Sequence, residues 1–253
     1  MKLTVLGNWS PYPVPGESCS GYLLEVDDKK ILLECGNGVV SRLHNYSFTW
    51  ELDLAIVTHL HPDHSGDLPL LRSAVNVGML YNYCHAKLPV YITEKPAERF
   101  EHMRSFADGL DFRYIDDLEG SGLIRKTKLH DIDISFMPVE HSIPAFAVSI
   151  EKDGKKLVYT SDTEYMTALE DFAHKANLLL CEATVMEKNK TYAEGRHLTT
   201  KQAGELAKRA EVKQLVATHF FPEYDSAAIR EEIKEGLDSN TFKMAAKDEG
   251  YEI

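Results

Sequence analysis

The sequence contains little cysteine, and its cysteines do not have the spacing of a metal site. Only four of the 253 residues are cysteine, and they lie far apart, at Cys19, Cys35, Cys84 and Cys181. Such spacing is typical neither of a disulfide framework nor of a thiolate zinc site. We therefore expect buried, reduced thiols.

Long apolar runs are also lacking. No window of about 18 consecutive apolar residues is present, so we expect no transmembrane helix. The first residues, MKLTVLGNWSPYPVP, do not have the charged and apolar regions of a signal peptide. Together these features predict a cytoplasmic protein with no membrane partner.

Positive charge is in deficit. Lysine and arginine number 28 against 40 aspartates and glutamates, which gives a net charge of -12 at pH 7. Since an acidic surface repels a phosphate backbone at long range, we expect no stable complex with nucleic acid. The hydrophobic fraction of 43% and the charged fraction of 27% are those of a globular protein that is long enough to bury its own core.

Hydrophobic patterns indicate a mixture of strands and helices. Short apolar runs bounded by turn residues predict strands at 2–6, 22–26, 30–35, 54–58, 90–93, 132–139, 146–150, 157–160, 178–181 and 214–218. Helical periodicity predicts helices at 67–80, 96–107, 200–211 and 226–236. Residues 108–128, acidic and then basic, are interpreted as a surface excursion. Early strands pair like hairpins and later strands alternate with helices, which predicts one α+β domain over residues 1–253 with two packed mixed sheets and helices on their outer faces.

Three histidines and an acid fall within the hexapeptide His59-Leu60-His61-Pro62-Asp63-His64, directly after the strand predicted at 54–58. A strand end lies at the rim of a sheet, where side chains can meet without disrupting the ladder. Imidazole nitrogens and carboxylate oxygens are ligands that Zn²⁺, Mn²⁺ and Fe²⁺ share. The alternative is a solvated histidine-rich loop, but this density of ligands in one hexapeptide favours two adjacent metal half-sites.

This hexapeptide resembles the signature of the metallo-β-lactamase superfamily, and the remaining motifs of that family follow in order. They are Glu140-His141-Ser142, Thr160-Ser161-Asp162-Thr163 and Thr218-His219-Phe220, each at the end of a predicted strand. The resemblance implies an αβ/βα four-layer sandwich and two divalent metal ions, zinc first and manganese or iron as alternatives. It assigns His59, His61 and His141 to one ion, Asp63, His64 and His219 to the other, and Asp162 as the bridge.

Within the superfamily, further segments are similar to ribonuclease Z and its small phosphodiesterase relatives. These are residues 32–38 (LLECGNG), Cys181-Glu182-Ala183-Thr184, and His197-Leu198-Thr199 before the helix at 200–211. The resemblance implies two-metal hydrolysis, in which Asp63 orients the attacking water or accepts its proton. His197 is the candidate general acid or phosphate ligand, and a histidine without catalytic work remains the alternative. Amides at Thr199 and Thr200 are expected to favour a bound phosphate.

The sequence departs from ribonuclease Z where that family inserts an arm that grips tRNA. His141 and Asp162 are only 21 positions apart, and a predicted hairpin around Asp153-Gly154 fills that interval. A small phosphodiester is therefore the predicted substrate: a cyclic nucleotide, a cyclic ribose phosphate or a short oligonucleotide. The alternatives are a tRNA 3′-processing endonuclease, a lactone or thioester hydrolase, and a non-catalytic binding scaffold. The resemblance also implies a homodimer.

Overall fold

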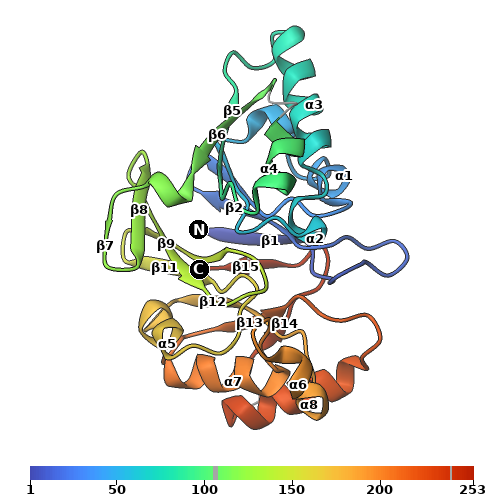
Figure 1. Ribbon diagram of the computed structural model, residues 1–253, viewed down its shortest axis with the longest axis vertical. Coiled ribbons are helices and arrows are strands. Elements are labelled where there is room, and N and C mark those ends of the chain that lie inside the picture. The colour runs from blue at the N-terminus through green and yellow to red at the C-terminus, as the bar shows by residue number, and fades with distance from the viewer. Residues whose placement is uncertain (105–107, 240) are drawn as a thin grey trace. The chain divides into compact units, whose positions relative to one another are not determined.

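The computed structural model describes residues 1–104, 108–239 and 241–253. The chain forms two compact units, one of Met1–Asp117 with Ala246–Glu252 and one of Leu118–Ala245 with Ile253. Each unit contains one mixed β-sheet with helices (Figure 1). The single-domain boundary at 1–253 remains a prediction.

The sheet of the first unit has seven strands among the described residues, in the order β15-β1-β2-β3-β4-β5-β6. The strands are β1 (Lys2–Gly7), β2 (Gly21–Val26), β3 (Lys29–Leu33), β4 (Leu54–Ile56), β5 (Leu88–Ile92), β6 (Leu110–Tyr114) and β15 (Gly250–Glu252). Pairing is antiparallel from β15 to β3 and parallel from β3 to β6. The short β4 is buried throughout, as expected for a central parallel strand.

The helices of the first unit lie in the connections between its strands. They are α1 (Val39–Leu43), the 3₁₀ turn η1 (Thr49–Glu51), α2 (Pro62–Ser65), α3 (Leu68–Leu80), α4 (Ala97–Arg104) and the 3₁₀ turn η2 (Ile115–Asp117). The helices predicted at 67–80 and 96–107 correspond to α3 and α4, and residues 105–107 of the second prediction lie outside the described residues. Pro62 occupies the first turn of α2, where its missing N–H leaves no bond unmade.

The sheet of the second unit has eight strands in the described part of the chain, in the order β14-β13-β12-β11-β10-β9-β8-β7. They are β7 (Gly120–Ser121), β8 (Ile124–Leu129), β9 (Ile132–Val139), β10 (Ala145–Lys152), β11 (Lys155–Tyr159), β12 (Leu178–Glu182), β13 (Leu215–Thr218) and β14 (Lys243–Met244). Strands β11 to β14 are parallel and the rest are antiparallel. Asp153 and Gly154 join β10 to β11 with φ of 51° and 75°, which confirms the predicted hairpin.

Helices α7 (Thr200–Arg209) and α8 (Ser226–Leu237) pack side by side in the second unit, which also has α5 (Thr167–Ala173), η3 (Glu187–Asn189) and α6 (Lys190–Ala193) (Figure 1). The hydroxyl of Thr199 accepts a hydrogen bond from the Gln202 N–H and so caps α7. A Cβ added at Gly236 would lie 2.0 Å from the Lys201 carbonyl oxygen, so the close approach of the two helices requires glycine there.

The predicted strands are confirmed, with ends that differ by at most two residues. The interpretation of residues 108–128 as a surface excursion is wrong, because they form β6, η2, β7 and most of β8. Strands β6 and β7 lie at sheet edges and β8 lies next to one, and half-buried and exposed residues alternate along much of β6 and β8. Charged side chains at such positions obscure the apolar pattern of a strand. Short elements such as α2, α6 and β14 were also not predicted.

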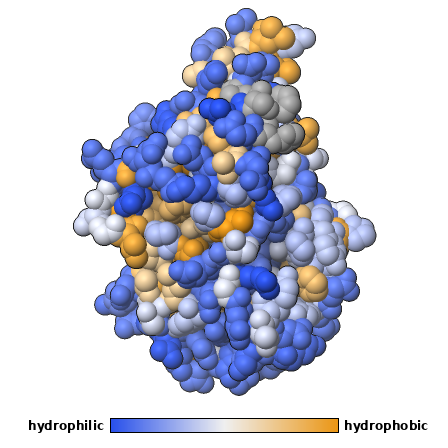
Figure 2. Space-filling view, viewed as in Figure 1, coloured by the Kyte–Doolittle hydropathy of each residue, from blue (hydrophilic) through white to orange (hydrophobic). Residues whose placement is uncertain are grey.

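Cys19, Cys35 and Cys181 are buried, Cys84 is half-buried, and all four are free thiols. Cys84 thus departs from the expected full burial because it lies in the connection that follows α3. The face of the molecule shown in Figure 2 is mostly hydrophilic, in keeping with the strong negative charge. Within the three described ranges, no helix is long and apolar enough to cross a membrane.

Candidate metal centre

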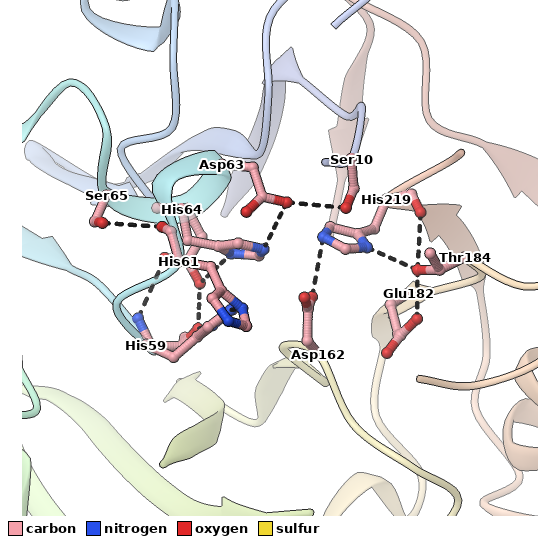
Figure 3. A network of polar contacts seen from close by, with 12 residues as sticks. Ser10, His59, His61, Asp63, His64, Ser65, Asp162, Glu182, Thr184 and His219 are labelled. Carbon is pink, nitrogen blue, oxygen red and sulfur yellow. Dashed lines mark hydrogen bonds and ion pairs between the residues drawn. The ribbon is translucent and has the colours of Figure 1, made fainter. Parts of the chain in front are cut away.

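The first group of candidate ligands follows β4 in the first unit (Figure 3). His59 and His61 lie together, with Nε2 of His59 3.1 Å from Nδ1 of His61, as the alternation of the extended loop predicts. Pro62 then starts α2 and brings Asp63 and His64 into its single turn, where both are buried. We call His59, His61, Asp63 and His64 the first ligand set.

Glu34 fixes the orientation of this set from the neighbouring strand. Because β3 and β4 are parallel, their carboxyl ends meet at one edge, and fully buried Glu34 comes next to Thr58. The carboxylate of Glu34 accepts from the N–H of Thr58 at 3.2 Å and from its hydroxyl, and lies 3.3 Å from Nδ1 of His64. Buried carboxylates of this kind hold the ring and tautomer of a metal-binding histidine.

Hydrogen bonds from neighbouring segments, including the LLECGNG segment, hold the backbone and the Asp63 side chain of the same loop. The N–H of Ser20 donates to the Asp63 carbonyl at 3.1 Å, and the N–H of Cys35 donates to the His64 carbonyl at 2.8 Å. A Cβ added at Gly36 would lie 2.0 Å from the Asp63 carbonyl oxygen, so only glycine allows this approach. The Ser10 hydroxyl also donates to the Asp63 carboxylate at 2.9 Å.

The second group lies in the second unit, at the ends of β9, β11 and β13 (Figure 3). These strands run in the same direction, so His141, Asp162 and His219 follow them at one edge of the sheet. Oδ1 of Asp162 lies 3.1 Å from Nε2 of His219, and Oδ2 lies 3.8 Å from Nε2 of His141. All three side chains are at most 2% exposed, and we call them the second ligand set.

Hydrogen bonds determine which ring nitrogens of the second set can bind a metal. Nδ1 of His141 faces the Arg196 carbonyl oxygen at 2.6 Å, and since a carbonyl only accepts, Nδ1 carries the proton. The Thr184 hydroxyl donates to Glu182 at 2.5 Å and therefore accepts from Nδ1 of His219 at 2.7 Å. In both rings Nε2 then carries the lone pair. Burial also lowers the pKa of His141, which favours the neutral, metal-binding form.

His197 lies beside the second ligand set, with Nδ1 3.2 Å from Oε1 of Glu182 and 4.0 Å from Oδ2 of Asp162. Glu182 is fully buried and also accepts from the Thr163 N–H at 2.8 Å. Asp162, His197 and His219 each offer a ligand atom within 4.8 Å of the others. The geometry therefore allows His197 to act either as a proton donor held by Glu182 or as an additional ligand.

The expectation of a phosphate at the start of α7 is not supported. The N–H of Thr200 donates to the Val185 carbonyl at 2.8 Å, and the N–H of Thr199 donates to the Gln202 side chain at 2.8 Å. The N–H of Gln202 is taken by the Thr199 hydroxyl. Because the capping box already uses these donors, a phosphate would have to displace them.

The donor atoms of both sets fit divalent metal ions. Ligand atoms bound tetrahedrally to zinc lie about 3.4 Å from one another. The pair His59–His61 is separated by 3.1 Å, and Asp162 lies 3.1 Å from His219 and 3.8 Å from His141. Burial raises the pKa of Cys19 to about 12 and that of Cys35 and Cys181 well above the ordinary thiol value. These thiols stay protonated at neutral pH, which leaves nitrogen and oxygen donors.

Some partners in these networks were missed by the sequence reasoning. Glu34, Glu182 and Thr184 lie in the quoted motifs but were given no role. A buried glutamate directly after an apolar strand is the signal that both Glu34 and Glu182 carry. His44, His85, His130 and His174, which match no motif, are exposed, and the side chain of His102 falls outside the described set.

A family model described as a β-lactamase superfamily domain matches residues 29–220. The chain belongs to this superfamily. One curated relative, the "Probable metallo-hydrolase YhfI" of Bacillus subtilis (strain 168), is 28% identical over 221 residues, which cover 87% of this chain and 86% of the relative. A ribonuclease Z of Clostridioides difficile (strain 630) is 26% identical over 297 aligned residues, which cover 96% of this chain and 95% of the relative.

The crystal structure of the metallo-β-lactamase fold protein YhfI from Bacillus subtilis matches with a TM-score of 0.87 and 26% identity, over 99% of this chain and 98% of that one. The predicted fold class, two mixed sheets with helices of metallo-β-lactamase type, is confirmed. The resemblance to the ribonuclease Z group is confirmed by the curated relatives. Superfamily membership and the histidine and carboxylate clusters support a metal-dependent hydrolase.

Proposed function

We propose that this chain hydrolyses a small phosphodiester with two divalent metal ions, zinc first. His59, His61 and His141 would hold one ion, Asp63, His64 and His219 would hold the other, and Asp162 would be shared. The observation that supports this most directly is the geometry of Asp162, whose two carboxylate oxygens face two different histidines. A carboxylate placed in this way is suited to bridge two ions.

The preference for a phosphodiester rests on His197 and on the relatives. A buried carboxylate at Nδ1 favours the imidazolium form of a histidine, and an imidazolium can give its Nε2 proton to a leaving group as a general acid does. One of the relatives is named ribonuclease Z, an enzyme class whose name implies cleavage of a phosphodiester. The β10–β11 hairpin is too short to grip a macromolecule, so the substrate is small.

The side chains then have separate tasks. Divalent ions, when bound, lower the pKa of water and offset the negative charge of a phosphoryl group. Asp63, held by the Ser10 hydroxyl, orients the attacking water or accepts its proton. Glu182 orients the His197 ring through Nδ1, and His197 would donate a proton from Nε2 to the departing oxygen.

A tRNA 3′-processing endonuclease is the second candidate, because the ribonuclease Z match spans 96% of this chain. The net charge of -12 and the plain hairpin between His141 and Asp162 argue against it. A lactone or thioester hydrolase would use the same ligands. A thiolate leaving group gains less from a proton donor at His197, and a lactone is disfavoured by the resemblance of His197-Leu198-Thr199 to the ribonuclease Z group.

The test is a substrate comparison with zinc-loaded and manganese-loaded protein. Bis(p-nitrophenyl) phosphate, a 2′,3′-cyclic nucleotide, p-nitrophenyl acetate and a precursor tRNA are assayed side by side, with metal-stripped protein as the control. We expect metal-dependent turnover of the two small phosphodiesters. Accurate cleavage of the precursor tRNA by this chain alone, or turnover confined to the carboxyl ester, would overturn the proposal.

We further propose a cytoplasmic homodimer that forms no stable complex with nucleic acid. The unpaired thiols are typical of a reducing compartment, and the dimer follows from the resemblance to ribonuclease Z. Light scattering during size-exclusion chromatography, with and without a tRNA, measures both the dimer and the absence of a complex.

A further inference from the structure

A pocket of about 570 Å³ lies in the second unit, outside the ligand set. Its wall comes from η3, α6 and the loop after β13, and we call it the tyrosine pocket. The lining side chains used below are Thr184, Lys188, Asn189, Tyr192, Phe221 and Tyr224. Its volume falls in the range of pockets that bind small organic molecules.

The pocket shares residues with the second ligand set and with His197. Thr184 is part of its wall, and the hydroxyl of this residue lies 2.7 Å from Nδ1 of His219. The ring of Tyr192 is nearly parallel to the imidazole of His197, at 17° with 6.5 Å between centroids. A molecule in the pocket is therefore adjacent to the ligand set and to the proposed proton donor.

Flat aromatic faces dominate the lining. Tyr192 is 59% exposed, so part of its ring is accessible to a ligand. Phe221 and Tyr224 form a tilted pair with 5.2 Å between centroids. Asn189 donates to the Tyr224 hydroxyl at 2.7 Å and brings an amide, which both donates and accepts, to the wall.

Two cations flank these rings. The ammonium of Lys188 lies 5.8 Å from the Tyr224 ring centre, and the guanidinium of Arg196 lies 5.3 Å from that of Tyr192. No carboxylate of the described residues pairs with either cation. In a chain with net charge -12, two such cations beside one pocket match an anionic ligand.

We infer that the tyrosine pocket binds the nucleobase of a nucleotide whose phosphoryl group lies at the second ligand set. Bases stack on aromatic side chains whatever their sequence, an amide can hydrogen-bond to a base edge, and the two cations attract the phosphate. This inference rests on the proposed phosphodiesterase function and specifies its substrate class as nucleotides.

The experiment measures binding, so that it does not depend on turnover. Adenosine 5′-monophosphate and ribose 5-phosphate are titrated into the zinc-loaded protein by calorimetry, and the nucleobase alone distinguishes the two ligands. We expect the nucleotide to bind at least tenfold more tightly. We expect Tyr192→Leu to remove this difference, while Tyr83→Leu, at a tyrosine 62% exposed in the other unit, leaves it unchanged.

Equal affinity for the two ligands, or a preference that survives in Tyr192→Leu, would overturn the inference. Circular dichroism confirms that each variant is folded, and Lys188→Ala serves as a second variant, with weaker binding of both phosphate ligands expected. If the nucleotide preference is present but no phosphodiester is hydrolysed, the proposed function fails and the pocket assignment stands. If a phosphodiester is hydrolysed but the nucleotide is not preferred, the pocket assignment fails and the proposed function stands.

Discussion

Asp162 directs its two carboxylate oxygens at two different histidines, Oδ1 at His219 and Oδ2 at His141. The side chain is 2% exposed, so contacts within the protein set this orientation. Its backbone position follows Ser161, whose φ of 57° is a left-handed conformation that is rare outside glycine and asparagine. Strained residues of this type cluster at functional sites, and His219 and Glu34 share the feature.

The first prediction concerns Asp162→Ala. If the carboxylate bridges two ions, its removal lowers the occupancy of both, and the variant loses hydrolysis. Metal analysis of the purified protein should give two divalent ions per chain for the native sequence and at most one for the variant. Asp171→Ala, an exposed aspartate of α5, is the matched control. A fully active native preparation with only one tightly bound ion would contradict the bridging role.

The second prediction concerns the hydroxyl of Thr184. Thr184→Val keeps the shape of this buried side chain but removes the acceptor for Nδ1 of His219, so the ring loses its fixed tautomer. Loss of such a partner costs about 10- to 100-fold in metal affinity. Competition with a chelator of known affinity measures the change. Exposed Thr167→Val should leave the affinity unchanged, and an unchanged affinity in Thr184→Val would show that His219 is oriented by other contacts.

The third prediction concerns Gly36. The Cβ of Gly36→Ala would lie 2.0 Å from the Asp63 carbonyl oxygen, so the loop that carries Asp63 and His64 must shift. Overpacking of this kind costs about 1–3 kcal/mol of the free energy of unfolding. Chemical denaturation should show this loss together with weaker metal binding. Gly250→Ala is the control, because the atom nearest to its added Cβ belongs to the flexible end of a lysine side chain. An equal loss of stability in Gly250→Ala would show that the close contact at Gly36 is not the cause.

The positions of the candidate ligands were predictable because each follows a strand with a local apolar pattern. His59, His141 and His219 come one to three residues after β4, β9 and β13. Their partners were not predictable in the same way. Glu34 reaches Thr58 and His64 only because β3 pairs with β4 in parallel, and this pairing is set by contacts distant in the sequence.

Two other features could not be predicted from the sequence, for different physical reasons. Strand β8 (Ile124–Leu129), next to the edge strand β7, carries charges on its exposed side, and these obscure the alternation of apolar and polar residues. The tyrosine pocket combines the segment around Tyr192 with Phe221 and Tyr224, which lie about one helix and one strand later in the sequence. Neither segment has a motif of its own, so only the folded chain shows that they form one wall.

The last prediction distinguishes the two roles that the geometry allows for His197. As a general acid held by Glu182, it contributes about 10²–10⁴-fold, and its help matters most for a poor leaving group. His197→Ala should then keep its full metal content, lose most activity toward a ribose or alkyl leaving group and lose much less toward p-nitrophenolate, which departs without a proton. Exposed His174→Ala is the control, with both activities retained.

If His197 is instead a ligand near Asp162 and His219, metal analysis of the variant shows lost ions, and the hydrolysis rates of both substrates fall together. An equal slowing with the metals retained would assign His197 to phosphate binding, and no slowing at all would leave it without a catalytic role.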